Sequence, residues 1–336
     1  MGAKPSHARG FGGSPPRPAK AGYVSTVRTT TSGRGAPYSY QRPSWRRPLI
    51  VLGVVIVILG LIAFGALTAY NAYHRYVQRL LVVPGCQAGT GANAFSMDFG
   101  QAADAATIAG VAARDRLPRE ALTVAYATAL QESKLENLDY GDQDSVGIFQ
   151  QRPSQGWGTT AELEDPAYAA GAFFKALVKI PGWAKLPVDV AAQDVQRSAD
   201  GAAYEQYAQT GAALAGYFTA KPHEVTCWYT PAAQAASEGV SAKLNLSAAL
   251  RQLDDVFGRP GAKGGLTAVR RARANGSAVI IAMRGDSWTV ANWLVSNASS
   301  YGITQVSYGG YQWTAGLFET TWQADAGPVR AGIVTS

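Results

Sequence analysis

Residues Leu130–Gly158 read LQESKLENLDYGDQDSVGIFQQRPSQGWG, and this stretch is the most informative part of the chain. It opens with the end of a helix-like run that carries Glu132 and passes through a polar turn. It closes with a glycine-punctuated run that contains the paired glutamines Gln150 and Gln151. A carboxylic acid held on rigid structure in a partly apolar cleft can keep its proton near neutral pH and act as a general acid. The pattern predicts that Glu132 has this role.

Other catalytic sets cannot be assembled from this sequence. The three histidines, His7, His74 and His223, are far apart, and no two of them have metal-ligand spacing. Neither a phosphate-binding GxxxxGK[ST] loop nor a GxGxxG run after a strand-like segment occurs. The sequence therefore predicts no metal and no cofactor. Carboxylates remain as the catalysts, and a glycosidic bond is one that a positioned carboxylic acid can open.

The basic character of the chain comes from its N-terminal end. The formal net charge is +7, but residues 1–48 hold nine basic residues and no acid, which leaves 21 basic and 23 acidic residues in the remainder. This end is rich in Gly, Pro, Ser and Thr, so residues 1–47 are predicted to be a disordered cytoplasmic arm whose charge sets the topology. A nucleic-acid-binding arm is the alternative, and we predict no nucleic-acid partner.

An apolar run follows the arm. Residues 48–72 contain no charged residue and are long enough as a helix to cross a bilayer. Arg46 and Arg47 precede the run directly, so the positive-inside rule predicts a cytoplasmic N-terminus, one transmembrane helix, and an extracytoplasmic remainder of a cell-membrane protein. A cleaved signal peptide is the alternative, although its charged region would be unusually long.

The chain has two cysteines, Cys86 and Cys227. On the predicted topology both lie in an oxidising compartment, and they bracket the segment that contains Glu132. We predict a disulfide that closes a loop of about 140 residues and contributes a few kcal/mol. Two unpaired buried thiols are the alternative.

Helical patterning dominates the segment between the cysteines. The expected helices run over residues 101–116, 118–133, from Asp165-Pro166 to 180, 188–198 and 201–219, and an ordered loop or short hairpin is expected over 137–158. Glu132 falls in the last turn of the second helix. Small residues at 121, 125, 128 and 129 share its face.

A smaller α+β unit is expected at the C-terminal end. A strand-like run covers 277–283, a helix begins near Ser287 and ends at Gly302, and a second strand over 303–308 leads into a turn at Gly309-Gly310. Trp293, Trp313 and Trp322 are expected in its core. The predicted organisation is an arm (1–47), a transmembrane helix (48–72), a stalk (73–95), a mainly α domain (96–229), a linker that can include a helix (230–258) and the α+β domain (259–336).

Residues 96–229 resemble the lysozyme-like superfamily, especially soluble lytic transglycosylases, goose-type lysozymes and phage-tail lysozymes. The resemblance rests on Glu132-Ser133 and on Ser145 followed by Gly147-Ile148-Phe149-Gln150. Residues 191–199, AAQDVQRSA, stand where the family has an Ala-Ala-Tyr-Asn motif, with Gln193-Asp194 in place of Tyr-Asn. The whole chain also resembles single-pass wall proteins of high-GC Gram-positive bacteria.

This resemblance implies a lysozyme-like catalytic domain that acts on peptidoglycan glycan strands. Glu132 would be the general acid and then the base. The residues implied in substrate binding are Ser145, Gly147, Phe149, Gln150, Gln151, Trp157, Gln193, Gln196 and Tyr204, where the amides bind N-acetyl and hydroxyl groups and the aromatic rings stack on sugars. The C-terminal unit resembles zinc-dependent peptidase-like wall domains, but no histidine follows His223, so it would be a metal-free binding or spacing domain.

Two mechanisms fit a single catalytic glutamate of this kind. In a lytic transglycosylase the 6-hydroxyl of the muramic acid attacks its own anomeric carbon. In a hydrolase a second carboxylate activates water, and Asp142 and Asp144 are the nearby candidates, although both also fit a solvated loop. We expect the transglycosylase. The alternative class is a non-catalytic wall-binding or assembly protein that keeps the cleft. A transport function is not expected, because a single transmembrane helix without charged residues provides no translocation path. Protein partners are not predicted.

Overall fold

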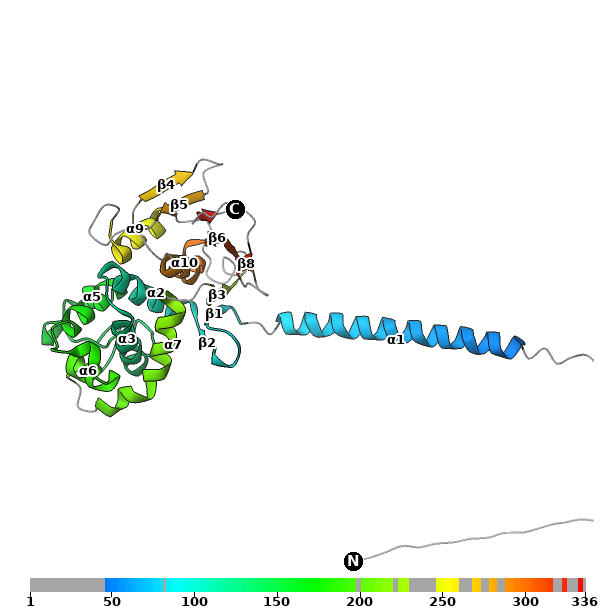
Figure 1. The fold of residues 1–336 in the computed structure, drawn as a ribbon, viewed down its shortest axis with the longest axis horizontal. Coiled ribbons are helices and arrows are strands. Elements are labelled where there is room, and N and C mark those ends of the chain that lie inside the picture. The colour runs from blue at the N-terminus through cyan, green and yellow to red at the C-terminus, as the bar shows by residue number, and fades with distance from the viewer. Residues whose placement is uncertain are drawn as a thin grey trace, which may run out of the picture. The chain divides into compact units, whose positions relative to one another are not determined.

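The computed structural model describes residues 46–80, 83–197, 201–219, 223–229, 246–259, 268–272, 278–282, 288–316, 322–324 and 332–334. Most of the predicted arm and residues 230–245 of the predicted linker lie outside these ranges. The chain divides into two units, Met1–Leu67 and Thr68–Ser336. The part that the structure describes is mainly helical, with a small β-sheet near the C-terminus (Figure 1).

The first helix, α1, spans Arg46–Leu80, and within it the 27 residues Pro48–His74 are long and apolar enough to cross a membrane. The expected transmembrane segment is thus a continuous helix. At 1.5 Å per residue this stretch measures about 40 Å, which exceeds the hydrocarbon thickness of about 30 Å.

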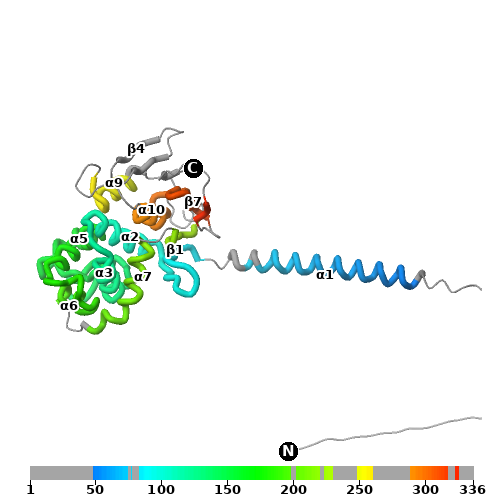
Figure 2. The backbone as a smooth tube through the Cα atoms, viewed as in Figure 1, coloured from blue at the N-terminus to red at the C-terminus, as the bar shows by residue number. Residues whose placement is uncertain are grey.

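Five helices form the body of the second unit. They are α2 (Phe99–Arg114), α3 (Arg119–Glu132), α5 (Pro166–Leu177), α6 (Val188–Gln196) and α7 (Ala208–Thr219), and shorter helical segments join them: η2 (Pro153–Gln155), α4 (Thr160–Leu163), η3 (Trp183–Lys185) and η4 (Gly201–Tyr207). The helices α2, α3 and α6 begin and end within two residues of the expected bounds, and α5 ends three residues before its expected end. The last expected helix begins as 3-10 turns. Figure 2 shows α3 in the middle, with α2, α5, α6 and α7 around it.

The helix starts follow the local sequence. Asp98 caps α2 by accepting a hydrogen bond from the Gln101 backbone, and the Gln101 side chain accepts one in return from the Asp98 backbone. Asp165 caps α5 by accepting from the Ala167 backbone, and Pro166 occupies the first turn of α5. The core between the helices is rich in alanine and contains the fully buried rings of Tyr126, Phe173 and Phe218.

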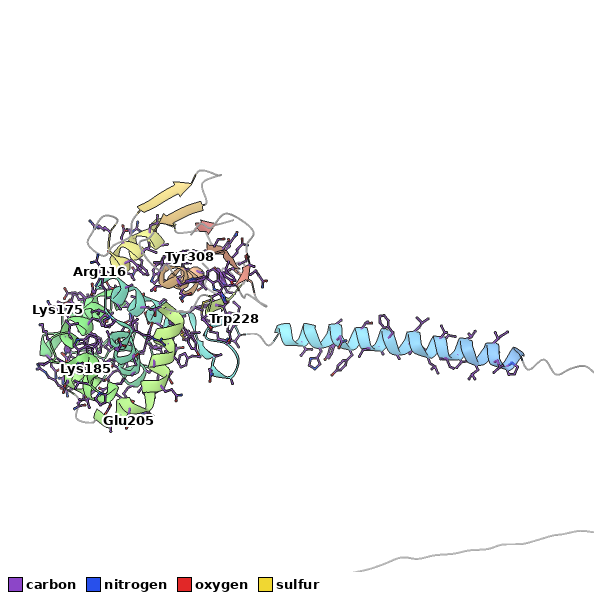
Figure 3. The ribbon with its side chains drawn as sticks, in the orientation of Figure 1. Arg116, Lys175, Lys185, Glu205, Trp228 and Tyr308 are labelled. Carbon is purple, nitrogen blue, oxygen red and sulfur yellow. A yellow bond between two sulfur atoms is a disulfide. The ribbon has the colours of Figure 1, made fainter. Side chains whose placement is uncertain are left out.

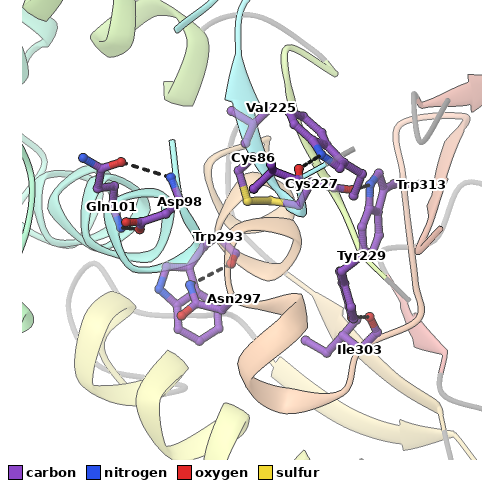
Figure 4. The surroundings of a disulfide bond; sticks show 12 residues. Cys86, Asp98, Gln101, Val225, Cys227, Tyr229, Trp293, Asn297, Ile303 and Trp313 are labelled. Carbon is purple, nitrogen blue, oxygen red and sulfur yellow. Dashed lines mark hydrogen bonds between the residues drawn. A yellow bond between two sulfur atoms is a disulfide. The ribbon is translucent and has the colours of Figure 1, made fainter. Parts of the chain in front are cut away.

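A three-stranded antiparallel sheet lies where the sequence predicted a stalk and the end of the mainly α domain. Its order is β2 (Phe95–Met97), β1 (Gly85–Ala88), β3 (Val225–Trp228), preceded by a short η1 (Gly91–Asn93). Cys86 and Cys227 face each other across β1 and β3 and form a disulfide (Figure 4). The predicted pairing is confirmed, and it fastens the two ends of the helical segment to one another.

The C-terminal elements comprise α9 (Leu246–Phe257), α10 (Trp288–Ser296), α11 (Ala298–Tyr301) and a six-stranded antiparallel sheet. The sheet order is β4 (Ala268–Ala272), β5 (Ala278–Ala282), β9 (Gly332–Val334), β6 (Gln305–Tyr308), β7 (Tyr311–Thr314), β8 (Gln323–Ala324). Gly309 and Gly310 both have positive φ and form the turn between β6 and β7, as their sequence predicts. Gly302 ends α11 in the left-handed conformation.

These elements share one core with the helical segment. The indole N–H groups of Trp313 and Trp322 donate to the backbone carbonyls of Cys227 and Val225, at 3.2 and 2.8 Å. Both acceptors lie on β3, so side chains rather than another strand satisfy this edge of the small sheet. Asn292 of α10 donates to the carbonyls at the end of α7. Part of the predicted linker is α9, which buries Leu253 and Val256 because its apolar face packs on α2.

Candidate active site

Glu132 is the last residue of α3, and its side chain is half-buried. The next residue, Ser133, is buried, and its hydroxyl donates to the carbonyl of Ile148 at 2.8 Å. This bond joins the two halves of the sequence pattern, the Glu-Ser pair and the Gly147–Gln150 run. The sequence placed these residues in one site, and the structure brings them together.

One oxygen of the Glu132 carboxyl receives two hydrogen bonds. The Tyr204 hydroxyl donates to Oε1 at 2.5 Å, and Gln196 Nε2 donates to the same oxygen at 3.3 Å. The Gln196 amide also donates to the carbonyl of Phe149 at 2.7 Å, which fixes the position of the amide. Among the described residues, Glu132 forms no ion pair, and no hydrogen bond reaches Oε2. The carboxyl is therefore oriented by neutral groups and has one oxygen free of protein donors from these residues.

The segment that carries Tyr204 is fastened to the end of α3. Lys134 Nζ donates to the Tyr207 hydroxyl at 2.6 Å and to the carbonyl of Leu130 at 2.9 Å, and it also lies over the Tyr207 ring. Gln206 donates to the Gln131 side chain at 3.3 Å. Tyr204 itself is almost fully buried. These contacts hold its hydroxyl at Glu132.

The backbone of the Gly147–Gln150 run requires a glycine at position 147. Gly147 has φ +78, and a Cβ at this position would collide with the carbonyl oxygen of Leu163. Its N–H donates to the carbonyl of Leu138 at 2.7 Å, and Val146 and Gln151 pair as an isolated antiparallel bridge. The expected ordered loop is therefore a compact structure packed against α4 and the end of α3.

Three residues expected to bind substrate have other contacts in the structure. The Phe149 ring is fully buried and stacks on Phe173 with 4.5 Å between ring centroids, so it belongs to the core. Gln151 is also buried, and its amide lies 3.5 Å from the Ala169 carbonyl. Gln150 donates to the carbonyls of Tyr140 and Gly147 and thereby closes the loop. We correct the assignments of Phe149 and Gln151, whose buried side chains stabilise the site from within.

The remaining predicted residues divide between the loop and the surface. Ser145 is buried, and its N–H donates to the Asp142 carbonyl. Tyr204 was expected to stack on a sugar, but its ring is buried and its hydroxyl binds Glu132. Gln193 is half-buried on α6. Trp157 is half-buried and lines an open pocket of about 1550 Å³ to which Gln196 also contributes.

Asp142 and Asp144, the candidates for a second carboxylate, differ in their surroundings. Asp144 accepts from Arg152 Nε at 2.8 Å and from the Ser154 N–H and hydroxyl at 2.7 and 3.0 Å. The hydrogen bond from Arg152, followed by those from Ser154, lowers the pKa of Asp144 to about 2. A carboxylate with so low a pKa is a weak base and a poor candidate for activating water. Asp144 instead stabilises the loop through its bonds to Arg152 and Ser154. Asp142 is exposed.

Sequence reasoning missed a buried acid behind the site. Asp104 of α2 is buried, and the backbone of Asn137 at the start of the loop partly offsets the effect of this burial on the pKa of Asp104. Desolvation, aided by the negative charge of Asp98, raises the pKa of Asp104 to about 8. A lone acid within the Ala-rich run AADAATIAG was the available signal, because such a helix has no polar face in which to place it.

This pKa predicts a pH-dependent stability. In the unfolded chain Asp104 loses its proton near pH 3.8, whereas in the folded chain it retains the proton up to about pH 8. The folded state thus binds more protons between these values, and its free energy of unfolding should fall as the pH rises. Asp104→Asn, which keeps the shape of the side chain but cannot ionise, should match the wild type at pH 4. At pH 8 it should be more stable by on the order of a few kcal/mol.

Urea denaturation of the full chain in detergent between pH 4 and pH 8 measures this difference. Asp139→Asn, at an exposed acid in the same loop, is the matched control and should leave the pH profile unchanged. A constant offset between wild type and Asp104→Asn at every pH would contradict the prediction.

A scan against known protein families finds no family that matches the chain, and a search of curated proteins finds no match. The resemblance to lysozyme-like enzymes therefore stays a prediction from the Glu132 and Gly147 patterns. Among the described residues, no three His, Cys, Asp or Glu side chains are grouped as ligands of a metal ion.

Proposed function

We propose that the protein is a membrane-anchored enzyme that cleaves peptidoglycan glycan strands at the β-1,4 bond between N-acetylmuramic acid and N-acetylglucosamine. The observation that carries the proposal is the environment of Glu132: a half-buried carboxyl at a helix end, with two neutral donors on one oxygen. A glycosidase acid needs this combination of rigidity and partial burial.

In the first step Glu132 donates its proton from Oε2 to the leaving O4 of N-acetylglucosamine, and the C1–O4 bond breaks. The bonds from Tyr204 and Gln196 to Oε1 suit the carbonyl oxygen of a protonated carboxyl. They also remain possible after the proton leaves, when they stabilise the carboxylate. The carboxyl thus keeps one geometry through the step.

In the second step the Glu132 carboxylate accepts a proton from the 6-hydroxyl of the muramic acid as the O6–C1 bond forms. This intramolecular attack yields a 1,6-anhydro end and requires no second carboxylate. The engagement of Asp144 with Arg152 and Ser154, and the low pKa of Asp144, favour this route over hydrolysis. Transglycosylation is accordingly the mechanism that we propose.

We further propose that the N-terminus is cytoplasmic and that the chain after about residue 73 lies outside the cell. Arg46 and Arg47 at the start of α1 support this topology. The disulfide between Cys86 and Cys227 also supports it, because such a bond persists in an oxidising compartment.

Mass spectrometry of the digestion products tests the reaction. The full chain in detergent, incubated with purified peptidoglycan, should release fragments with anhydro ends, one water lighter than the reducing ends that a hydrolase leaves. Reducing ends would show a hydrolase instead. Binding without any released fragment would favour the rival reading, a non-catalytic wall-binding protein.

Tyr204→Phe tests the positioning of Glu132. Loss of the hydroxyl removes a hydrogen bond of about 1–2 kcal/mol to the carboxyl, so kcat should fall about tenfold while KM stays nearly constant. Tyr217→Phe is the matched control, since its hydroxyl donates to the carbonyl of Asn93 instead of to Glu132. Equal effects of the two substitutions would count against a specific role for Tyr204.

A further inference from the structure

An open pocket of about 1550 Å³ lies on the second unit beside the candidate active site. One face of α5 and the turn after it form one wall, through Tyr168, Gly171, Ala172, Lys175, Ala176 and Lys179. Pockets for small molecules usually have about 300–1000 Å³, so this one has room for a branched or polymeric ligand.

The α5 wall carries positive charge and no acid. Lys175 and Lys179 are exposed at its C-terminal end, and neither forms an ion pair with a carboxylate of the described residues. Four acidic residues also line the pocket. Asp115 pairs with Arg114, Asp165 caps the start of α5, Asp194 lies on α6 and Asp255 lies on α9. The two ammonium groups are therefore available to an anionic ligand.

The pocket adjoins Glu132 through a single side chain. Gln196 lines the pocket and donates to Glu132 Oε1 at 3.3 Å. Trp157 and Tyr168 also line the pocket and lie side by side, with the Tyr168 hydroxyl 3.4 Å from the Trp157 carbonyl. A ligand whose sugar reaches Glu132 can thus extend along the α5 wall.

We propose that this pocket binds the peptide branches of the glycan strand, and that Lys175 and Lys179 hold their carboxylates. The inference rests on the proposed function, in which the ligand is peptidoglycan. The branches leave the strand at the muramic acid and carry free carboxylates, which match two ammonium groups beside the cleavage site. The enzyme would then prefer strands that still carry their peptides.

The test compares two forms of one substrate: soluble glycan fragments with peptides, and the same fragments after an amidase has removed them. Both are titrated into the full chain in detergent, with Glu132→Gln to prevent turnover. The Kd for peptide-bearing fragments should be about tenfold lower than for stripped ones, and Lys175→Gln/Lys179→Gln in the same background should abolish this preference. Lys185→Gln, at an exposed lysine outside the pocket lining, is the matched control and should retain it (Figure 3).

The outcomes separate the two proposals. Two results would overturn the proposed peptide pocket. The first is that the chain without lysine substitutions binds both fragments equally, and the second is that the double lysine variant keeps the preference for peptide-bearing fragments. Because this readout is binding, it does not depend on turnover. If the chain with Glu132 intact cleaves neither fragment but binding still prefers peptides, the proposed reaction fails and the pocket stands. In an active enzyme the double variant should raise KM for peptide-bearing strands about tenfold and leave KM for stripped strands unchanged.

Discussion

Glu132→Gln should reduce the release of glycan fragments from purified peptidoglycan by about a thousandfold or more. General acid catalysis alone contributes about 10²–10⁴ to a rate, and Glu132 serves as both acid and base in the proposed reaction. Glutamine keeps the shape of the side chain and can accept the hydrogen bonds from Tyr204 and Gln196, so the site should stay assembled. The loss should therefore appear in kcat, whereas KM should change little.

Two controls make this result specific. Glu136→Gln alters an exposed carboxylate four residues further on and should leave the rate unchanged. Thermal unfolding should give the same midpoint for Glu132→Gln as for the wild type, which excludes loss of fold as the cause. Activity of Glu132→Gln at the wild-type rate would remove the basis of the proposed mechanism. The cleft would then be a binding site for the glycan strand in which Glu132 has no catalytic role.

The sequence was sufficient to locate Glu132 and to place Ser133 and Gly147 beside it. It could not give the direction of each side chain in the loop. Within GIFQQ, Phe149 and Gln151 point into the protein, because the bridge between Val146 and Gln151 folds the run back on itself. Helical or strand periodicity does not apply to such a turn. Sequence alone therefore assigned these two side chains to the substrate, and the structure assigns them to the core.

The partners of Glu132 were similarly hard to predict. Gln196 and Tyr204 lie 64 and 72 residues beyond it in the chain, and only the packing of α6 and η4 on α3 brings them to the carboxyl. The helix predicted over 188–198 does contain Gln196. Tyr204 belongs to a 3-10 segment that the periodicity had treated as α-helix, so its inward direction could not be inferred.

The elements of the C-terminal part were predictable, but their attachment was not. The turn at Gly309-Gly310, the stop at Gly302 and the burial of Trp293 all follow from local patterns. The hydrogen bonds from Trp313 and Trp322 to β3 join residues more than 80 positions apart in the chain. Local patterns could not predict them. The composition change near residue 230 suggested a linker, yet α9 within it shares the core of α2.

Trp293→Ala should destabilise the whole of the second unit by about 3–5 kcal/mol. The Trp293 side chain is fully buried, and its indole N–H lies 3.3 Å from the Thr107 hydroxyl of α2. Its ring also contacts Phe257 of α9 and Tyr301 of α11. Truncation leaves a cavity between three helices that are distant in the sequence. For a protein whose folding free energy is typically about 5–15 kcal/mol, this is a large part of the total.

Hydrogen exchange of the full chain in detergent distinguishes a shared core from two independent domains. With a shared core, amides of α2 and α3 should lose protection together with those of α10, because unfolding is cooperative across the contact. Trp183→Ala, at a half-buried tryptophan of η3, is the control and should cost clearly less. Should α10 alone lose protection while α2 and α3 keep theirs, the C-terminal part folds as a separate domain. The disulfide and β3 would then be a tether between domains instead of part of one core.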